Sequence, residues 1–321
     1  MSEFVCPVTR QPLRLTQDGE FLETSDGRRY PVREGIPELL SSESREGAAT
    51  RESQQYYRDK AREYDHGMDV LFRTFDAQER PVREQMIGLL NLAPGMRVLE
   101  TGCGTGRDTV QLAGRAELLY SSDVSREMIS VCQVRLRDAG VSPDAVRLFV
   151  SDAAAVPFPD DYFDAAYHFG GLNEFPDVRR GLTEMVRVVK PGGRVVFGDE
   201  GLGPWLLATT FGQILLNAKS LYRHQPPLAL LPPDVRDVGC RWIIGGAFYV
   251  VDCTVGRGEP PLDLDVRFPG WRGGSHRTRF YGKLDGVAPE LRQQAIQAAA
   301  REGLPLTDWI EKTLRDALSE T

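Results

Sequence analysis

Three glycines at alternate positions, Gly102, Gly104 and Gly106, stand between an apolar run at 98–99 and a helical pattern at 110–113. This order predicts a strand, a glycine turn and a helix. Glycines at such a junction let the backbone approach a ligand closely and adopt dihedrals that a side chain would forbid, and the following helix offers unpaired N–H groups. The chemistry that this stretch favours is the binding of a small ligand against backbone amides.

The next acidic residue indicates what kind of ligand this is. A second apolar run, 118–120, is followed by Asp123, at the distance where a βαβ unit places a carboxylate on ribose hydroxyls. A dinucleotide fingerprint would need its third glycine at 107, where the chain has Arg107, and no lysine follows the glycines as a phosphate loop requires. The pattern predicts a nucleoside-containing cofactor.

The motif that remains, ETGCGTG from Glu100 to Gly106, resembles motif I of class I S-adenosylmethionine-dependent methyltransferases. This resemblance implies that S-adenosylmethionine is the cofactor and S-adenosylhomocysteine the product. It implies that Glu100 and the glycine backbone hold the methionine end, and that Asp123 takes the ribose. The residues that it assigns to cofactor binding are Tyr64, Glu100, Gly102, Cys103, Gly104, Gly106, Asp123, Val124, Met128, Asp152, Ala153, His168 and Phe169.

Three of these residues belong to later motifs of the same family. Met128 lies in the first turn of a helix predicted after Ser125, where the family packs an apolar side chain on adenine; the alternative is a filler of the core. Asp152 and Ala153 end a third predicted strand and resemble the motif in which a carboxylate meets the adenine amino group and the next N–H meets a ring nitrogen. A strand-end Asp that only caps a helix is the alternative.

The segment 156–198 matches the family in its order of elements. It runs VPFPDDYFDAAYHFGGLNEFPDVRRGLTEMVRVVKPGGRVVFG, with a fourth strand from Phe163, a helix that Pro191 ends, a glycine turn and a buried fifth strand. Within it, FGGLNEFPD resembles the FGLRN-type stretch of quinone C-methyltransferases, from which Glu174 and Phe175 depart. Residues 240–255 add two strands joined at 245–246.

These elements predict an α/β fold. We expect a Rossmann-like, seven-stranded methyltransferase sheet that is mostly parallel with an antiparallel last strand, a small N-terminal β minidomain and a C-terminal helical extension. The expected boundaries are 1–40 for the minidomain, 41–52 for a linker, 53–255 for the methyltransferase domain with its N-terminal lid helices, and 256–321 for a C-terminal loop and helices.

The minidomain resembles the zinc-ribbon-type domain found as a partner of some methyltransferases. Only Cys6 of the usual two C-x-x-C pairs is present, because Thr9, Thr24 and Gly27 stand at the other ligand positions. We therefore expect no zinc there, and a packing or interaction role.

The helical stretch that follows carries the pair Tyr64-Asp65. AREYDHGMD resembles part of the quinone-biosynthesis methyltransferases, in which a Tyr-Asp pair lies on a helix across the cofactor pocket. The tyrosine is either part of a lid or part of the buried stripe of an amphipathic helix.

His168 is the candidate catalytic base, because it ends the fourth strand near the switch point of the sheet and titrates near neutrality. The alternative is a hydrogen-bonded core histidine, and His224 and His276 are weaker candidates. Aromatic residues beyond 200 favour an apolar or aromatic small-molecule acceptor. Three arginines at 272, 277 and 279 either bind an anionic group of that acceptor or form a solvated loop.

Composition limits the partners. The formal net charge is −7, so the sequence shows no basic footprint for nucleic acid. The five cysteines suggest neither a disulfide framework nor a metal site and fit a reducing cytoplasm. We expect a cytoplasmic protein with no apolar signal core, membrane span or metal, and a possible homodimer formed through the C-terminal helices.

The function that follows is methyl transfer to a small, apolar or aromatic acceptor that is quinone-like, isoprenoid or a natural-product intermediate. Two alternatives remain open. One is an RNA or protein methyltransferase, and the other is a cofactor-binding protein or cyclase that transfers no methyl group.

Overall fold

The structure is a computed structural model that describes residues 3–280 and 287–319, without the side chains of 48–50, 53, 57–59 and 62. The chain divides into two compact units, Met1–Pro260 and Pro261–Thr321. The first unit contains the sheet and the candidate site, and each unit is described by itself.

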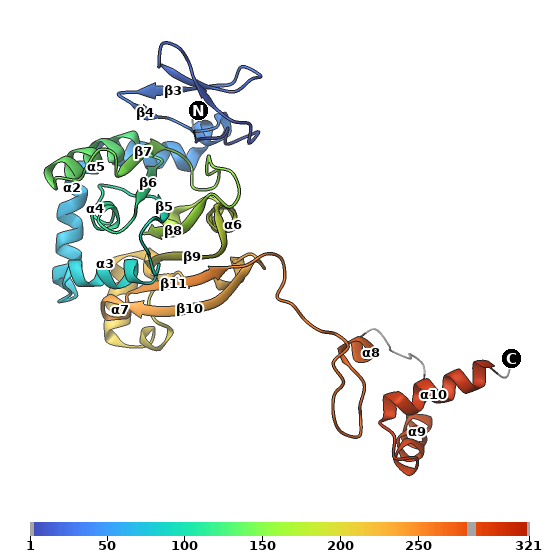
Figure 1. Ribbon diagram of the computed structural model, residues 1–321. Helices are drawn as coiled ribbons and strands as arrows, with labels where there is room; N and C mark the ends of the chain where they lie inside the picture. Colours follow the sequence, from blue (N-terminus) through green and yellow to red (C-terminus); the bar gives the residue numbers. More distant parts are fainter. Residues whose placement is uncertain (1–2, 281–286, 320–321) are drawn as a thin grey trace. The chain divides into compact units, whose positions relative to one another are not determined.

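A seven-stranded sheet forms the centre of the first unit (Figure 1). Its strands are β5 (Arg97–Thr101), β6 (Leu118–Asp123), β7 (Val146–Val150), β8 (Phe163–Phe169), β9 (Val189–Glu200), β10 (Val235–Ile243) and β11 (Phe248–Val255). They lie in the order β10-β11-β9-β8-β5-β6-β7, and β11 is antiparallel to both of its neighbours. The predicted fold class is confirmed.

Strand order also fixes where a ligand binds. β5 pairs in parallel with β6 on one side and with β8 on the other. The strand order therefore reverses at β5: β6 and β7 extend the sheet on one side, and β8 and β9 extend it on the other. Ligands of open α/β sheets bind at the carboxyl ends of the strands at such a switch point. The glycine turn at 102–106 follows β5 directly and therefore lies at this edge.

Helices cover both faces of the sheet. They are α3 (Glu79–Gly88), α4 (Thr109–Ala113), α5 (Arg126–Asp138), α6 (Val178–Val188) and α7 (Thr210–Ala218). Alternate residues of the buried strands face two different cores: Tyr167 packs in one, whereas Ala166 packs in the other with Leu182 of α6. This two-sided burial explains the nearly continuous apolar runs of the parallel strands.

The minidomain is a four-stranded antiparallel sheet of β1 (Arg14–Leu15), β2 (Phe21–Glu23), β3 (Arg29–Arg33) and β4 (Ile36–Pro37). It packs on the larger sheet, where the Leu39 N–H donates to the Val150 carbonyl at 2.7 Å. Arg10 donates to Glu184 of α6 at 2.7 Å and to the Val156 carbonyl at 2.6 Å. The minidomain thus shares its buried core with the larger sheet.

The former zinc-ligand positions have other partners. Cys6 is buried, with its sulfur 3.1 Å from the Tyr30 hydroxyl, and the Thr9 N–H donates to the same sulfur at 3.4 Å. The Thr24 hydroxyl contacts Asp26. Cys6 and Thr24 therefore each have hydrogen-bond partners within the minidomain.

The expected linker at 41–52 is helical. Ser41 caps α1 (Ser42–Glu46) by accepting from the Ser44 N–H, and α2 (Ala48–Thr74) begins after Gly47. A low apolar content does not prevent a helix that has a cap and packs on a neighbour, and the role of this segment as a linker stays a prediction. α2 runs beside the edge where the parallel strands end (Figure 1).

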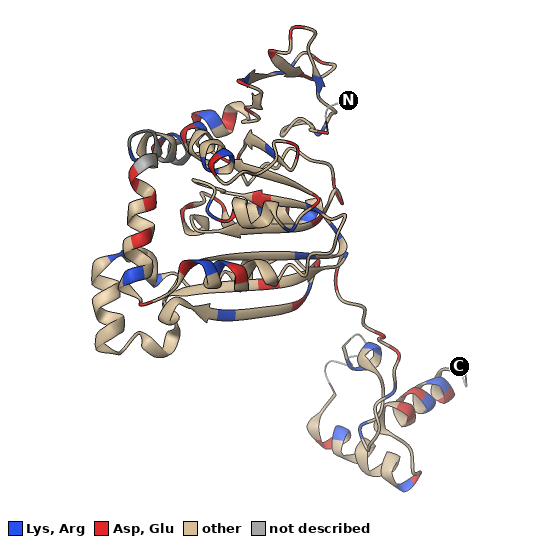
Figure 2. Ribbon diagram, turned by 60° about the vertical axis from the view of Figure 1, so that its left-hand side comes forward, with Lys and Arg blue, Asp and Glu red and all other residues tan. Residues whose placement is uncertain are grey.

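The second unit contains α8 (His276–Phe280), α9 (Pro289–Arg301) and α10 (Leu306–Ser319). Glu302, between α9 and α10, accepts from the Trp309 indole at 2.8 Å and from Lys312 at 2.9 Å, and these bonds fix the helix pair. Figure 2 shows acidic and basic residues mixed along α10. Among the described residues, no helix is both long enough and apolar enough for a bilayer crossing.

Candidate functional site

The glycine turn is a cradle that packs closely on neighbouring side chains at two of its glycines and faces open space at the third. Gly102 has φ +65°, and a Cβ there would lie 2.8 Å from Cε1 of His168. Gly106 has φ +85°, and a Cβ there would lie 2.6 Å from the sulfur of Cys132. Both positions require glycine for conformation and for space. A Cβ at Gly104, which has φ +52°, would have no atom of the described residues within 4 Å, so this Cα faces open space.

Asp123 at the end of β6 ties the turn to the next strand. Its Oδ2 accepts from the Gly104 N–H and its Oδ1 from the Ser125 N–H, both at 2.9 Å. Burial raises the pKa of this carboxyl, and the hydrogen bonds from Ser125 and Gly104 oppose the rise. A carboxylate oxygen accepts more than one hydrogen bond, so each oxygen keeps acceptor capacity for a ribose hydroxyl.

Glu100 is deeply buried beside the glycine turn. It is 2% exposed, and its Oε2 accepts from the Ser121 hydroxyl at 2.7 Å. Burial raises the pKa of Glu100 to about 8, with a further contribution from Asp108. Near neutral pH this side chain is mostly protonated, so it presents a neutral group beside the turn.

The adenine-side residues lie along the same edge. Met128 is buried in the first turn of α5, and Ser125 caps that helix by accepting from the Met128 N–H at 3.3 Å. Asp152 accepts from the Ala154 N–H and from the Ser44 hydroxyl, both at 2.8 Å. The predicted cofactor roles of Met128, Asp152 and Ala153 stay predictions.

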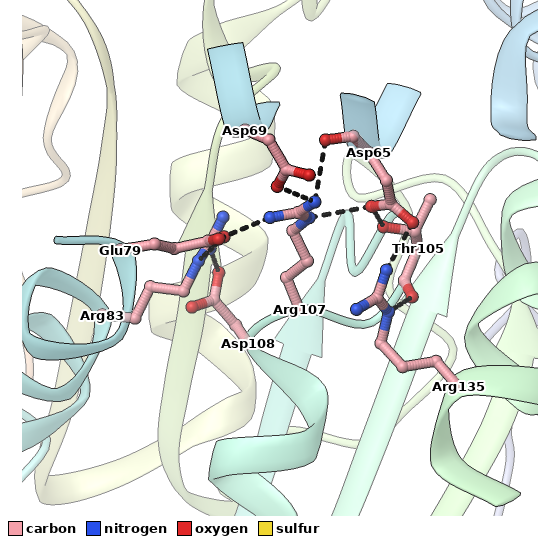
Figure 3. A network of polar contacts seen from close by, with 8 residues as sticks. All are labelled: Asp65, Asp69, Glu79, Arg83, Thr105, Arg107, Asp108 and Arg135. Carbon is pink, nitrogen blue, oxygen red and sulfur yellow. Dashed lines mark hydrogen bonds and ion pairs between the residues drawn. The ribbon is translucent and has the colours of Figure 1, made fainter. Parts of the chain in front are cut away.

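α2 is fastened to the glycine turn by a network of ion pairs (Figure 3). Asp65 accepts from the Thr105 hydroxyl at 2.7 Å and from Arg107 Nε at 2.8 Å, and it pairs with Arg135 of α5. Arg107 also donates to Asp69 at 2.8 Å. The Asp of the Tyr-Asp pair therefore holds α2 against residues of the turn itself.

The same network continues into α3. Arg107 donates to Glu79, which in turn accepts from Arg83 at 2.8 Å (Figure 3). Arg83 is 5% exposed and donates to Asp108 at 2.5 Å. Side chains from α2, α3 and α5 thus converge on the segment 105–108 that follows the last glycine of the cradle.

Tyr64, next to Asp65 on α2, is half-buried. Burial raises its pKa, the charge of Arg83 opposes the rise, and the charges of Glu200, Asp123 and Asp199 add to it. The lid role of Tyr64 stays a prediction.

His168 lies under the turn. Its Nδ1 is 2.8 Å from the Thr101 carbonyl oxygen, so Nδ1 carries the proton, and the buried Nε2 has no hydrogen-bond partner among the described residues. Burial lowers the pKa of His168 to about 4, and the ring stands edge-on to Phe175 at 5.1 Å. Its base role stays a prediction, but this geometry favours support of the turn.

The other predicted side chains lie as follows. Phe169 is half-buried with its ring 5.9 Å from that of Phe248. Cys103 is buried, and its N–H donates to the Ser122 carbonyl at 2.9 Å. The Val124 carbonyl accepts from Gln54 of α2 at 2.9 Å. His276 belongs to the second unit.

An acid pair at the end of β9 was missed from the sequence. Asp199 is fully buried and Glu200 is 8% exposed. Asp199 accepts from the Asn173 N–H at 2.6 Å, and Glu200 accepts from Lys219 at 2.5 Å. Two consecutive acids follow the buried run at 195–198, but no local pattern indicates their contacts with Asn173 and Lys219.

The pKa values of the two acids move in opposite directions. Burial and the neighbouring Glu200 raise the pKa of Asp199 well above its ordinary range. Burial acts in the same direction on Glu200, but the hydrogen bond from Asp199 and the charge of Lys219 prevail and lower its pKa. Asp199 therefore holds a proton more readily than Glu200 does.

The donor set fits a nucleoside cofactor. The turn faces open space at Gly104, and the Asp123 carboxylate that ends the next strand keeps acceptor capacity beside it. No group of three or more His, Cys, Asp or Glu among the described residues is arranged to hold a metal ion.

Comparison with known proteins agrees with this geometry. Residues 99–197 match the family model described as methyltransferase domain. The demethylmenaquinone methyltransferase of Bacillus subtilis (strain 168) is 33% identical over 143 residues, which are 41% of this chain and 60% of that protein. The methyltransferase GfsG of Streptomyces halstedii is 34% identical over 125 residues, covering 39% of this chain and 44% of that protein.

A third relative belongs to the same group. The ubiquinone/menaquinone biosynthesis C-methyltransferase UbiE of Bordetella avium (strain 197N) is 39% identical over 113 residues, which cover 34% of this chain and 43% of that protein. The chain thus spans about half the length of the curated relatives it matches. Its central part, with the sheet order and the glycine turn described above, is a class I S-adenosylmethionine-dependent methyltransferase domain.

Proposed function

We propose that the protein transfers the methyl group of S-adenosylmethionine to a small, apolar or aromatic acceptor. The observation that carries this proposal is the glycine cradle at 102–106 with Asp123 bonded across it. The cofactor supplies a methyl group that is electrophilic because it is bonded to a sulfonium. The chain aligns the acceptor and excludes water, and alignment alone supplies several kcal/mol, on the scale of about 7 to 11 for well-oriented reactants.

The residues that would hold the cofactor are distributed along one edge. The turn and Glu100 would hold the methionine end, Asp123 and Val124 the ribose, and Met128 with 152–153 the adenine. Asp65 would keep α2 over this site through its bonds to Thr105 and Arg107.

The acceptor class is supported by the relatives and by the surface beside the strand ends. Two relatives are named as methyltransferases of quinone biosynthesis. Aromatic rings gather near the ends of β9 and β10, where Trp205 stands edge-on to Trp242 at 5.3 Å and Phe211 to Phe75 at 6.3 Å. An apolar, flat acceptor suits such surroundings.

For the partners, we propose a homodimer formed through the second unit. Leu291 of α9 and Leu314 of α10 are 56% and 45% exposed. Light scattering tests this: Leu291→Lys with Leu314→Lys is expected to give a monomer, and an unchanged mass would contradict the proposal.

Methyl transfer is tested with reduced demethylmenaquinone and S-adenosylmethionine, followed by mass spectrometry. We expect a product one methylene heavier, formed with stoichiometric S-adenosylhomocysteine, and none from the Gly102→Ala variant. Salt-sensitive methylation of RNA instead would favour the RNA methyltransferase alternative. Cofactor binding without methylation of quinol, RNA or protein would favour a non-methylating role.

A further inference from the structure

The short helix α1, which follows the minidomain, contacts the acid at the end of β7. This acid, Asp152, accepts from the Ala154 N–H with Oδ1 and from the Ser44 hydroxyl with Oδ2, both at 2.8 Å. The Ser44 hydroxyl in turn accepts from the hydroxyl of Ser41, a buried residue, at 2.9 Å. The two oxygens of Asp152 are therefore held from two sides, and the bond to Ser44 comes from a distant part of the sequence.

The same N-terminal stretch, 39–54, makes further bonds along this edge of the sheet. The Leu39 N–H donates to the carbonyl of Val150, the last residue of β7, at 2.7 Å. The Gln54 side chain of α2 donates to the carbonyl of Val124, directly after β6, at 2.9 Å. The stretch that joins the minidomain to α2 is thus bonded to the ends of two neighbouring strands.

These two strand ends are where the proposed function places adenosine, with Asp123 at the ribose and Asp152 at the adenine. The amino group of adenine is a hydrogen-bond donor, and an ionised carboxylate only accepts. Each Asp152 oxygen accepts one bond within the described residues and keeps a lone pair for a ligand. A carboxylate that is held in one plane offers this lone pair in a fixed direction, whereas one that turns freely does not.

We propose that Ser44 is a positioning residue that orients Asp152 toward the amino group of adenine. The stretch that follows the minidomain then takes part in selecting an adenine-containing cofactor, although Ser44 acts only through Asp152. This inference rests on the proposed function and adds a residue outside the methyltransferase motifs to its cofactor site.

The test compares S-adenosylhomocysteine with S-inosylhomocysteine, in which a carbonyl oxygen replaces the amino group of the base. Calorimetric titration of the full protein gives the dissociation constant of each ligand. The readout is the ratio of the two constants, because a merely structural loss would weaken both ligands alike. The variants are Ser44→Ala, Ser44→Thr, which keeps a hydroxyl, and Asp152→Asn. Ser42→Ala is the matched control, since Ser42 is an exposed serine of the same helix.

We expect the wild type to bind S-adenosylhomocysteine about tenfold or more tightly than S-inosylhomocysteine, because a carboxylate accepts from the amino group and repels the carbonyl oxygen. Ser44→Ala should lower this ratio about threefold or more, and Ser44→Thr should restore it. Asp152→Asn should lower it further, because the asparagine amide donates to the carbonyl oxygen. Ser42→Ala should keep the wild-type ratio.

Two outcomes for the variants would overturn the inference. One is an unchanged ratio in Ser44→Ala, even if both ligands bind more weakly, and the other is an unchanged ratio in Asp152→Asn. If Ser44→Ala does not fold, Ser44→Cys takes its place, since a thiol is a weaker donor than a hydroxyl and should lower the ratio in the same direction.

The wild type itself separates this inference from the proposed function. Equal binding of the two ligands would overturn the inference and leave the cofactor site standing. Failure of the wild type to bind S-adenosylhomocysteine would overturn the proposed function together with the inference.

Discussion

The candidate site has two halves, and backbone groups form one whereas side chains form the other. At the ends of β5 and β6, the glycine turn presents backbone, and Asp123 is held by the N–H groups of Gly104 and Ser125. At the end of β9, side chains dominate: Asp199, Glu200, Lys219 and Tyr222 come from the strand and from the segment after α7. The first half depends on the shape of the backbone, whereas the second half depends on the charges of its side chains.

Because of this difference, the two halves should be sensitive to different kinds of substitution. A backbone cradle fails when a Cβ fills it or when the strand behind it moves, whereas an acid pair fails when one proton is lost or gained. Substitutions that add volume should therefore act on the glycine turn, whereas substitutions that change charge at constant volume should act on the acid pair and on the ion pairs and buried acid around the turn.

The largest effect is expected at Gly102. Gly102→Ala puts a Cβ 2.8 Å from His168 and forces a side chain into φ +65°, which together cost about 2 to 4 kcal/mol. We expect S-adenosylhomocysteine affinity to fall on the order of 100-fold by calorimetric titration. Gly140→Ala is the matched control, since Gly140 has φ +68° but a Cβ there would meet no described atom within 4 Å.

The Gly140→Ala variant should lose about 1 kcal/mol of stability and no affinity. If both variants bind like wild type, the close approach at Gly102 does not shape the site. If both lose affinity equally, backbone strain rather than space is what matters.

The next effect tests whether α2 belongs to the cofactor half. Asp65→Asn removes the charge that pairs with Arg107 and Arg135, and we expect about tenfold weaker S-adenosylhomocysteine binding with about 1 to 3 kcal/mol less stability in urea. Asp69→Asn is the control: Asp69 is 60% exposed and pairs, within the described residues, with Arg107 alone, so its loss should cost about 0.5 kcal/mol or less. Equal effects of the two variants would contradict a specific role for Asp65.

The pKa of Asp65 adds a pH dependence to this fastening. Burial acts to raise that pKa, but hydrogen bonds from Arg107 and Thr105 and the charge of Arg135 prevail and lower it. Because the folded-state pKa lies below the unfolded value of about 3.9, the stabilisation is full above that value and is lost as pH falls through the folded pKa. Wild type and Asp65→Asn should therefore converge in stability below about pH 4.

Glu100, in the cofactor half, should give a pH dependence of stability opposite in sign to that of Asp65. Its folded pKa of about 8 lies above the unfolded value of about 4.3, so the folded state holds an extra proton between these values and loses stability as pH rises. Glu100→Gln keeps the acceptor for Ser121 without the titration. Relative to this variant, wild type should lose at most about 1.4 kcal/mol per pH unit between pH 5 and 8 in urea unfolding.

Parallel pH profiles of wild type and Glu100→Gln would show that Glu100 is ionised in the folded protein. Ser130→Ala is the control, because the Ser130 hydroxyl on α5 donates to the Arg126 carbonyl and not to Glu100. This variant should follow the wild-type pH profile.

The smallest effect is expected at the minidomain. Arg10→Met removes the bond to Glu184, but Arg187 still pairs with that carboxylate at 2.8 Å, so the cost should be about 1 kcal/mol. Arg14→Met, at an exposed position of β1, should cost nothing measurable in urea. A separate early unfolding transition of the wild type would contradict a minidomain that shares the buried core.

Sequence reasoning found the parts of this molecule that depend on backbone geometry. The glycines at 102–106 and the strand-end acid Asp123 have local causes, so the sheet and the cradle could be predicted from short patterns. The turn expected at 192–193 is part of β9 instead, because α6 ends at Val188 and the strand begins at Val189. The helical segment at 41–52 could not be predicted, because its stability comes from a cap and from packing of α2. Asp199 and Glu200 were missed because a paired acid is recognised only when distant residues, Asn173 and Lys219, are seen to contact it.

The central claim is that the turn and Asp123 form the cofactor site, and the most direct measurement is calorimetric titration of S-adenosylhomocysteine into wild type and Asp123→Ala. Wild type should bind at one site per chain, and the variant should bind at least 100-fold more weakly, because it loses both the ribose acceptor and the bonds that hold Gly104. Equal binding by the two proteins would contradict the account.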